Sequence, residues 1–155
     1  MTSEIDKLNA ELETRKHIHQ VRKLLQEMVV MLLKRGENHD ATKLEAPEAE
    51  GFAEYTPKLA TSTYGSDEYN QFLKDMQPFL KFHYMKNSHH PEFYENGVDD
   101  MNLIDLIEML CDWKAATLRH NDGDIHKSIE HNADRFGLSP QIVHIFRNTA
   151  KSLGW

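Results

Sequence analysis

Residues 39–43 read His39-Asp40-Ala41-Thr42-Lys43 and lie at a break between two helical patterns. The adjacent histidine and aspartate offer one nitrogen and one carboxylate oxygen to a common point, which suits a divalent cation of intermediate hardness. An aspartate at a helix start beside a surface histidine would produce the same pair. The rest of the chain must therefore distinguish a metal site from an ordinary helix start.

The composition is that of one soluble domain. The chain has 155 residues, of which 39% are hydrophobic and 28% are charged, enough for a single compact core. We find no apolar run near the roughly 20 residues that span a bilayer, and no signal-peptide core. The one cysteine, Cys111, excludes an intrachain disulfide and is typical of a reducing compartment. We therefore expect a cytoplasmic protein with a single domain over residues 1–155.

The net charge of −7, with histidine neutral, limits the partners that we expect. A nucleic-acid polymer is disfavoured, because its phosphate backbone needs a cationic surface. A small phosphorylated substrate remains compatible, since a bound cation can reverse the local field. The absence of a membrane-spanning run also removes the membrane from the expected partners, while the oligomeric state stays open.

Hydrophobic periodicity predicts an all-α fold, with no convincing strand alternation. Gly36 is expected to stop the first helix, and Pro78 to kink or restart the second. Residues 45–65 contain two prolines and two glycines and are expected to be mainly loop with short helical turns. Residues 88–97 are expected to form a loop, and residues 121–124 a turn. The predicted helices cover residues 5–34, 66–86, 99–119, 125–136 and a last helix with Ser139 as N-cap and Pro140 at its first position.

The first predicted helix carries two histidines that point in different directions. His17 lies on the same stripe as Val21 and Leu24, whereas His19 lies about 160° round the helix. We therefore expect His17 to face inward and His19 to face solvent. An inward His17 suits a metal ligand, and it equally suits a core histidine that hydrogen-bonds a backbone carbonyl.

The helix predicted over residues 99–119 is apolar around most of its circumference, yet one stripe carries Asp105, Glu108, Asp112 and Arg119. Carboxylates that face inward on a buried helix must be paired or bound to metal. A carboxylate network closed by Arg119 would satisfy this rule without any metal. Among the three carboxylates, Asp112 is the best ligand candidate because it lies in the middle of the helix.

A third group of candidates is His83, His89 and His90, three histidines within eight residues. His83 shares a helix face with Met76, and the other two lie just past the helix end, where Pro91 pushes the preceding residue out of helical geometry. Histidines in this arrangement suit metal ligands or proton-transfer groups. A polar surface loop is the alternative interpretation.

These motifs, in this order, resemble the HD-domain metal-dependent phosphohydrolases, an all-helical superfamily. His17 resembles the first ligand of that superfamily, and residues 39–43 resemble its His-Asp-x-x-Lys motif, with Thr42 where many members have glycine. His89-His90-Pro91-Glu92 resembles the His-His-Glu segment of two-metal members, although Pro91 intrudes. Asp112, followed by Trp113-Lys114-Ala115-Ala116, resembles the last ligand. Most of the chain, especially 87–92, 108–116 and 121–132, also resembles an uncharacterised family of small bacterial and phage proteins, which brings no activity.

The HD resemblance implies a compact HD-like helical bundle that holds one or two divalent ions of Mn, Fe, Co, Zn or Mg. It implies hydrolysis of a phosphate ester or anhydride, with a nucleotide as the expected substrate. Three alternatives remain: an HD-type di-iron oxygenase, a non-catalytic nucleotide-binding module and a structural metal site. Lys43 and His89 are the expected catalytic residues, in charge stabilisation and proton transfer, and Lys86 and Arg119 the expected substrate-binding residues. The expected metal ligands are His17, His39, Asp40 and Asp112 for the first ion, and His83 and His90, with His89 as a further candidate, for the second.

Overall fold

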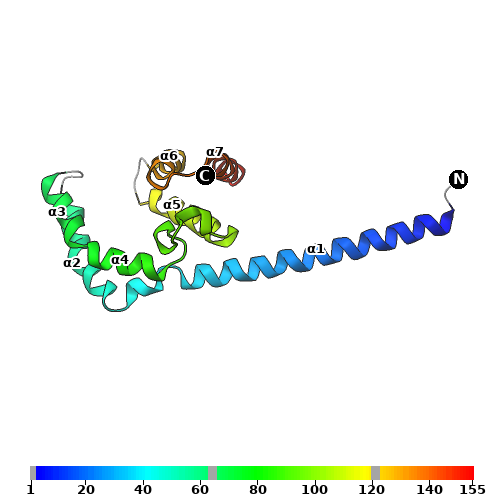
Figure 1. Ribbon diagram of the computed structural model, residues 1–155, viewed down its shortest axis with the longest axis horizontal. Coiled ribbons are helices and arrows are strands. Elements are labelled where there is room, and N and C mark those ends of the chain that lie inside the picture. The colour runs from blue at the N-terminus through cyan, green and yellow to red at the C-terminus, as the bar shows by residue number, and fades with distance from the viewer. Residues whose placement is uncertain (1–2, 63–65, 120–122) are drawn as a thin grey trace. The chain divides into compact units, whose positions relative to one another are not determined.

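The computed structural model describes residues 3–62, 66–119 and 123–155 (Figure 1). Within these ranges the chain forms helices and no β-strand, which confirms the all-α prediction. None of the described helices is both long and apolar enough to cross a bilayer. The chain divides into two units, Met1–Glu37 and Asn38–Trp155, which are described separately.

From Glu4 on, the first unit is formed by one long helix, α1 (Glu4–Asn38), whose last residue belongs to the second unit. Acidic residues in its first turn and Arg35 in its last turn complement the helix dipole. The prediction that Gly36 stops this helix is wrong, because α1 continues for two residues beyond it. A single glycine costs a helix only about 1 kcal/mol, and neighbouring hydrogen bonds can outweigh that. Taken by itself, α1 has no buried residue.

Residues 45–65 differ most from their prediction, because they contain a full helix, α2 (Glu48–Thr61). Gly51 and Pro57, which suggested a loop, lie inside that helix. At Gly51 the helix approaches Phe79 so closely that an added Cβ would lie 2.3 Å from the phenyl Cγ. The glycine therefore permits close packing against a neighbouring helix, and this packing outweighs its low helix propensity.

The predicted helix over residues 66–86 is two helices, α3 (Asp67–Asp75) and α4 (Gln77–Lys86). Ser66 is the N-cap of α3, and its hydroxyl accepts a hydrogen bond from the backbone N–H of Tyr69 at 3.1 Å. The restart predicted at Pro78 is confirmed, since that proline lies in the first turn of α4. The short 3₁₀ helix η2 (Pro91–Phe93) follows in the segment predicted as a loop, and a second one, η3 (Gly97–Asp100), begins at the end of that segment.

Helix α5 (Leu103–Thr117) begins later than predicted. Asp99 and Asp100 belong to η3, and the actual N-cap is Asn102, which forms a capping box with Asp105. Helix α6 (Ile125–Phe136) has the predicted bounds, and Gly137 after it has a left-handed conformation. Helix α7 (Pro140–Ser152) begins at the predicted residue. The turn expected at residues 121–124 lies partly outside the described residues.

The hydrophobic core of the second unit joins α5, α6 and α7, which lie together in Figure 1. Trp113 of α5 packs edge-on against Phe146 of α7, with 5.7 Å between their ring centroids. This core holds α5 in place from one side. The core side chains are Met109, Leu110, Trp113, Ile125, Ile129, Phe146 and Ala150.

Candidate metal centre

Potential metal ligands from four segments of the second unit converge on one region. His39 and Asp40 precede the 3₁₀ helix η1 (Ala41–Leu44), and Asp40 is its N-cap. Asp40 has a φ of 54°, the left-handed conformation that aspartate tolerates better than most residues. The remaining candidates come from α4, from the segment between α4 and η2, and from α5: His83, His89, His90, Glu108 and Asp112.

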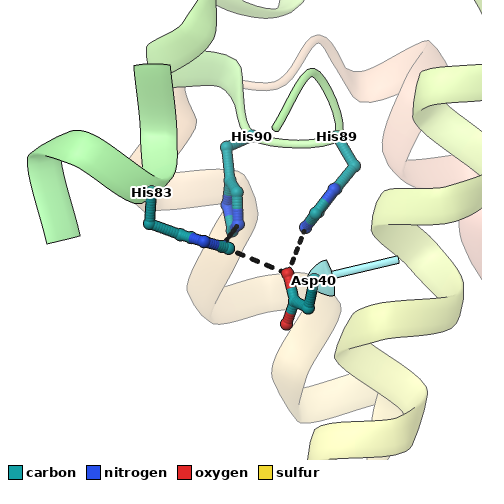
Figure 2. Close-up of side chains that lie close together, drawn as sticks. All are labelled: Asp40, His83, His89 and His90. Carbon is teal, nitrogen blue, oxygen red and sulfur yellow. Dashed lines mark hydrogen bonds and ion pairs between the residues drawn. The ribbon is translucent and has the colours of Figure 1, made fainter. Parts of the chain in front are cut away.

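The first group of ligand atoms comprises Asp40, His83, His89 and His90, whose atoms all lie within 4.8 Å of one another. Figure 2 shows the three imidazoles directed toward the Asp40 carboxylate. Oδ1 of Asp40 lies 3.2 Å from Nε2 of His83 and 3.5 Å from Nε2 of His89. Nε2 of His83 lies 2.9 Å from Nε2 of His90. Three imidazole nitrogens and one carboxylate oxygen therefore surround a common point.

Two atoms of this first group are buried without a hydrogen-bond partner, namely Oδ1 of Asp40 and Nε2 of His89. A buried polar atom left unpaired costs about 1–3 kcal/mol, and a charged one costs more. A cation among the four ligand atoms would satisfy both. The chemistry also fits, because imidazole nitrogen combined with carboxylate oxygen is a ligand set of intermediate-hardness divalent metals. On these grounds the residues present fit a bound cation.

A second group, formed by His39, Asp40 and Asp112, shares the aspartate with the first group. Nε2 of His39 lies 3.5 Å from Oδ2 of Asp40 and 3.5 Å from Oδ1 of Asp112. Asp40 therefore directs Oδ1 toward the first group and Oδ2 toward the second. Oδ2 also accepts a hydrogen bond from Nζ of Lys43 at 2.5 Å, so Lys43 lies on the same side as Asp40.

Two further carboxylates lie behind the histidines. Oε2 of Glu48, a residue with 0% exposure, lies 2.8 Å from Nδ1 of His83. Oε1 of Glu108 lies 2.9 Å from Nδ1 of His39 and 3.1 Å from Nδ1 of His89. The Nδ1–H of each of these histidines would donate to the carboxylate beside it, which leaves its Nε2 to face the ligand groups.

Hydrogen bonds also anchor the segment that carries His89 and His90. Asp105 of α5, fully buried, accepts from the hydroxyl of Ser88 at 2.9 Å and from that of Tyr94 at 2.7 Å. The backbone N–H of Asn102 donates to the same carboxylate at 3.1 Å. The segment is thus tied to α5 on both sides of the histidine pair.

The electrostatic environment shifts the pKa values of two histidines of the site in opposite directions. Interactions with the carboxylates of Asp112 and then Glu108 raise the pKa of His39 to about 10, against the opposing effect of burial. Burial, followed by repulsion from His89 and His83, lowers the pKa of His90 to about 3. In the metal-free protein at neutral pH, His39 therefore binds a proton and His90 is neutral.

Both aspartates of the site are ionised at neutral pH. Burial raises the pKa of Asp40, but the adjacent His83 imidazole and the Lys43 ammonium lower it by more, and the net shift is strongly downward. Burial likewise raises the pKa of Asp112, and His39 more than offsets this, so the net shift is again downward. Two anionic carboxylates are thus available as ligands.

The predicted substrate-binding residues lie at different distances from this arrangement. Lys86, at the end of α4, lines a cavity of about 250 Å³ with Thr42, Glu45, Ala46 and Phe82. Thr42 of this cavity accepts a hydrogen bond from the amide of Asn87 at 3.0 Å, and the same amide nitrogen lies 3.0 Å from Nδ1 of His83. Arg119 lies beyond the last residue of α5 and is exposed.

His17, the predicted ligand from the first helix, is exposed on α1, as is His19. It lies in the first unit, and the three ligand groups found among the described residues do not include it. Its role as a ligand stays a prediction. The six other residues that the sequence predicted around the metal, His39, Asp40, His83, His89, His90 and Asp112, are all members of these groups.

Sequence reasoning missed the role of Glu48 and left that of Glu108 undefined. Glu48 lies in the segment that was expected to be mainly loop, so its complete burial could not be expected. Glu108 was noted on the acidic stripe of α5, four residues before Asp112, which places both on one helix face. That spacing was the only signal for a carboxylate behind the ligands.

Comparison with known proteins yields one match. The model of a family of unknown function, DUF5662, matches residues 6–152. No curated protein and no solved structure matches the chain. The family match agrees with the resemblance to an uncharacterised family, whereas membership of the HD-domain superfamily stays a prediction. Because the match extends over nearly the whole sequence, the chain belongs to this family of unknown function.

Proposed function

We propose that this protein is a metal-dependent phosphohydrolase that acts on a small phosphorylated substrate, with a nucleotide as the first class to test. One observation carries the proposal: Oδ1 of Asp40 and Nε2 of His89 are buried without hydrogen-bond partners and face the same point as two further imidazoles. A site of this kind, with a lysine beside it, favours chemistry on an anionic group.

A bound divalent cation would act as a Lewis acid on a phosphoryl oxygen and lower the pKa of a water molecule. The protein residues would supply the rest. Asp40 and the histidines would hold the cation in place, and Asp112 would add a second anionic ligand. Nζ of Lys43 lies within reach of any anion at the centre, because it already contacts Oδ2 of Asp40. There it would stabilise the charge that develops on the phosphoryl oxygens.

The ligand chemistry narrows the choice of ion. Imidazole nitrogen suits Mn, Fe, Co and Zn better than Mg, which prefers carboxylate, carbonyl and water ligands. The position formed by His83, His89 and His90 with Asp40 is therefore expected to select a transition metal. We expect Mg²⁺ alone to support weaker binding there than Mn²⁺ or Co²⁺.

The test is elemental analysis of the purified full-length protein, followed by phosphate-release assays on nucleotides with each metal. Phosphate release by the wild type and its loss in Asp40→Asn would support the proposal. An absence of hydrolysis across the panel would overturn it. Tight nucleotide binding without turnover would then favour a binding module, and oxygen consumption by the iron-loaded protein would favour an oxygenase. A metal bound with neither activity would favour a structural site.

A further inference from the structure

The carboxylate of Glu108 has an unusual position, because a single oxygen contacts two histidines that belong to different ligand groups. Oε1 lies 2.9 Å from Nδ1 of His39 and 3.1 Å from Nδ1 of His89. The two imidazoles lie close together, with 4.5 Å between their ring centroids. The Glu108 side chain is only 9% exposed, so water is largely kept from these contacts.

The other nitrogens of the two histidines face different partners. Nε2 of His39 lies 3.5 Å from Oδ1 of Asp112, in the group of His39, Asp40 and Asp112. Nε2 of His89 lies 3.5 Å from Oδ1 of Asp40, in the group of three histidines. We infer that Glu108 is a positioning residue for both cation positions, because one oxygen sets the tautomer and the ring orientation of one ligand in each.

Glu108 could instead be a ligand itself, since His39, His89 and Glu108 also form a group able to hold a cation. One feature argues against this. A cation among these three residues would leave Nε2 of His89 buried without a partner. As an orienting acceptor, Glu108 leaves both Nε2 atoms free for metal.

Glu48 provides an internal comparison. Its Oε2 lies 2.8 Å from Nδ1 of His83, which belongs only to the three-histidine group. Loss of Glu48 should therefore weaken one cation position, whereas loss of Glu108 should weaken both. Orienting carboxylates of this kind typically contribute about 10- to 100-fold to metal affinity.

The experiment is calorimetric titration of metal-free, full-length protein with Co²⁺, combined with the visible absorption spectrum of the bound Co²⁺. Glu108→Gln keeps the size of the side chain, and Glu108→Ala removes the acceptor altogether. Glu48→Gln is the one-position comparison. Glu130→Gln is the matched control, because Glu130 also accepts a hydrogen bond, from Arg147 at 2.7 Å, but is exposed on α6. Circular dichroism of each metal-free variant reports whether it is folded.

We expect the wild type to bind two ions, Glu108→Gln to lose about 10-fold or more in affinity at both, and Glu108→Ala to lose more. The Co²⁺ absorption bands of both ions should change in Glu108→Gln, and those of one ion in Glu48→Gln. Unchanged affinity in folded Glu108→Gln and Glu108→Ala, or loss at only one position, would overturn the inference.

The inference rests on the metal centre of the proposed function and not on hydrolysis, so the two can fail separately. A wild type that binds a single ion would overturn the shared role of Glu108 and leave a phosphohydrolase with one metal intact. A wild type that binds no ion would overturn both. A protein that binds two ions through Glu108 yet hydrolyses nothing would overturn the proposed function alone.

Discussion

Asp40 lies against His83, with 3.2 Å between carboxylate Oδ1 and imidazole Nε2. The opposite oxygen, Oδ2, contacts Lys43 and lies 3.5 Å from Nε2 of His39. One aspartate therefore belongs to both ligand groups, and its left-handed backbone conformation directs it there. The first prediction follows from this shared position.

Asp40→Ala and Asp40→Asn should each lose bound metal while the helical content is retained, because the charged ligand common to both groups is removed. Asparagine tolerates the left-handed conformation better than alanine, so Asp40→Asn separates loss of charge from backbone strain. Asp99→Ala, at an exposed aspartate of η3, is the control. Elemental analysis and circular dichroism are the measurements, and full metal occupancy in both Asp40 variants would remove Asp40 from the ligand set.

Lys43→Ala should retain the metal but lower turnover by roughly 10²-fold or more, as expected for loss of one preorganised charge. Lys43 lies 5.0 Å from the centroid of the Phe52 ring and pairs with an acidic residue three positions earlier. Lys58 is a matched control, because it lies 4.6 Å from the Tyr55 ring centroid and pairs with Glu54. Steady-state rates on the identified substrate decide, and a Lys43→Ala enzyme with wild-type kcat and kcat/KM would contradict the assigned role.

Metal affinity should rise with pH between about 7 and 9. The pKa of His39, raised to about 10 in the metal-free protein by Asp112 and Glu108, means that a cation must displace its proton. One displaced proton corresponds to about a tenfold change in apparent affinity per pH unit below that pKa. Calorimetry at several pH values in buffers of different ionisation enthalpy measures the released protons. In His39→Ala this pH dependence should flatten, and an unchanged slope would show that another group titrates.

The same raised pKa makes the metal-free protein less stable at alkaline pH. The folded-state pKa of His39 exceeds its unfolded value of about 6.5, so its stabilising contribution is complete below pH 6.5 and disappears as the pH rises toward 10. His90 acts in the opposite direction: its pKa is lowered to about 3, so stability falls as the pH drops from about 6.5 toward 3. Chemical denaturation of the metal-free protein should therefore show greatest stability near neutral pH. His39→Ala should abolish the loss on the alkaline side, and its persistence would refute this assignment.

Asp105→Ala should destabilise the fold by about 3 kcal/mol and weaken metal binding, because three part-buried hydrogen bonds to this buried carboxylate are lost and the His89–His90 segment is released from α5. Asp100→Ala is the control, since Asp100 is an exposed carboxylate that accepts the backbone N–H of Asn96 at 3.0 Å. Urea denaturation and Co²⁺ calorimetry measure the two effects. A variant with wild-type stability would mean that the network contributes little.

Features that depend on a few consecutive residues could be predicted from the sequence. Ser139 was identified as an N-cap and residues 125–136 as a helix, because both depend on hydrogen bonds or backbone angles within about four residues. The residues suited to metal binding were also recognisable, since the type of a side chain determines whether it offers an imidazole nitrogen or a carboxylate oxygen. These local rules determined the all-α class and six of the candidate ligands.

Only the tertiary structure decided how those ligands are grouped and what lies behind them. Residues 48–61 form helix α2, in which Gly51 packs against Phe79 from another helix, an interaction that no local rule contains. Glu108 contacts His39 across 69 positions of sequence, and Glu48 contacts His83 across 35. Helical periodicity gives the direction of a side chain relative to its own helix axis. The division of the site into two groups that meet at Asp40 depends instead on how separate helices pack. That packing is set by the apolar surface that the helices bury against one another.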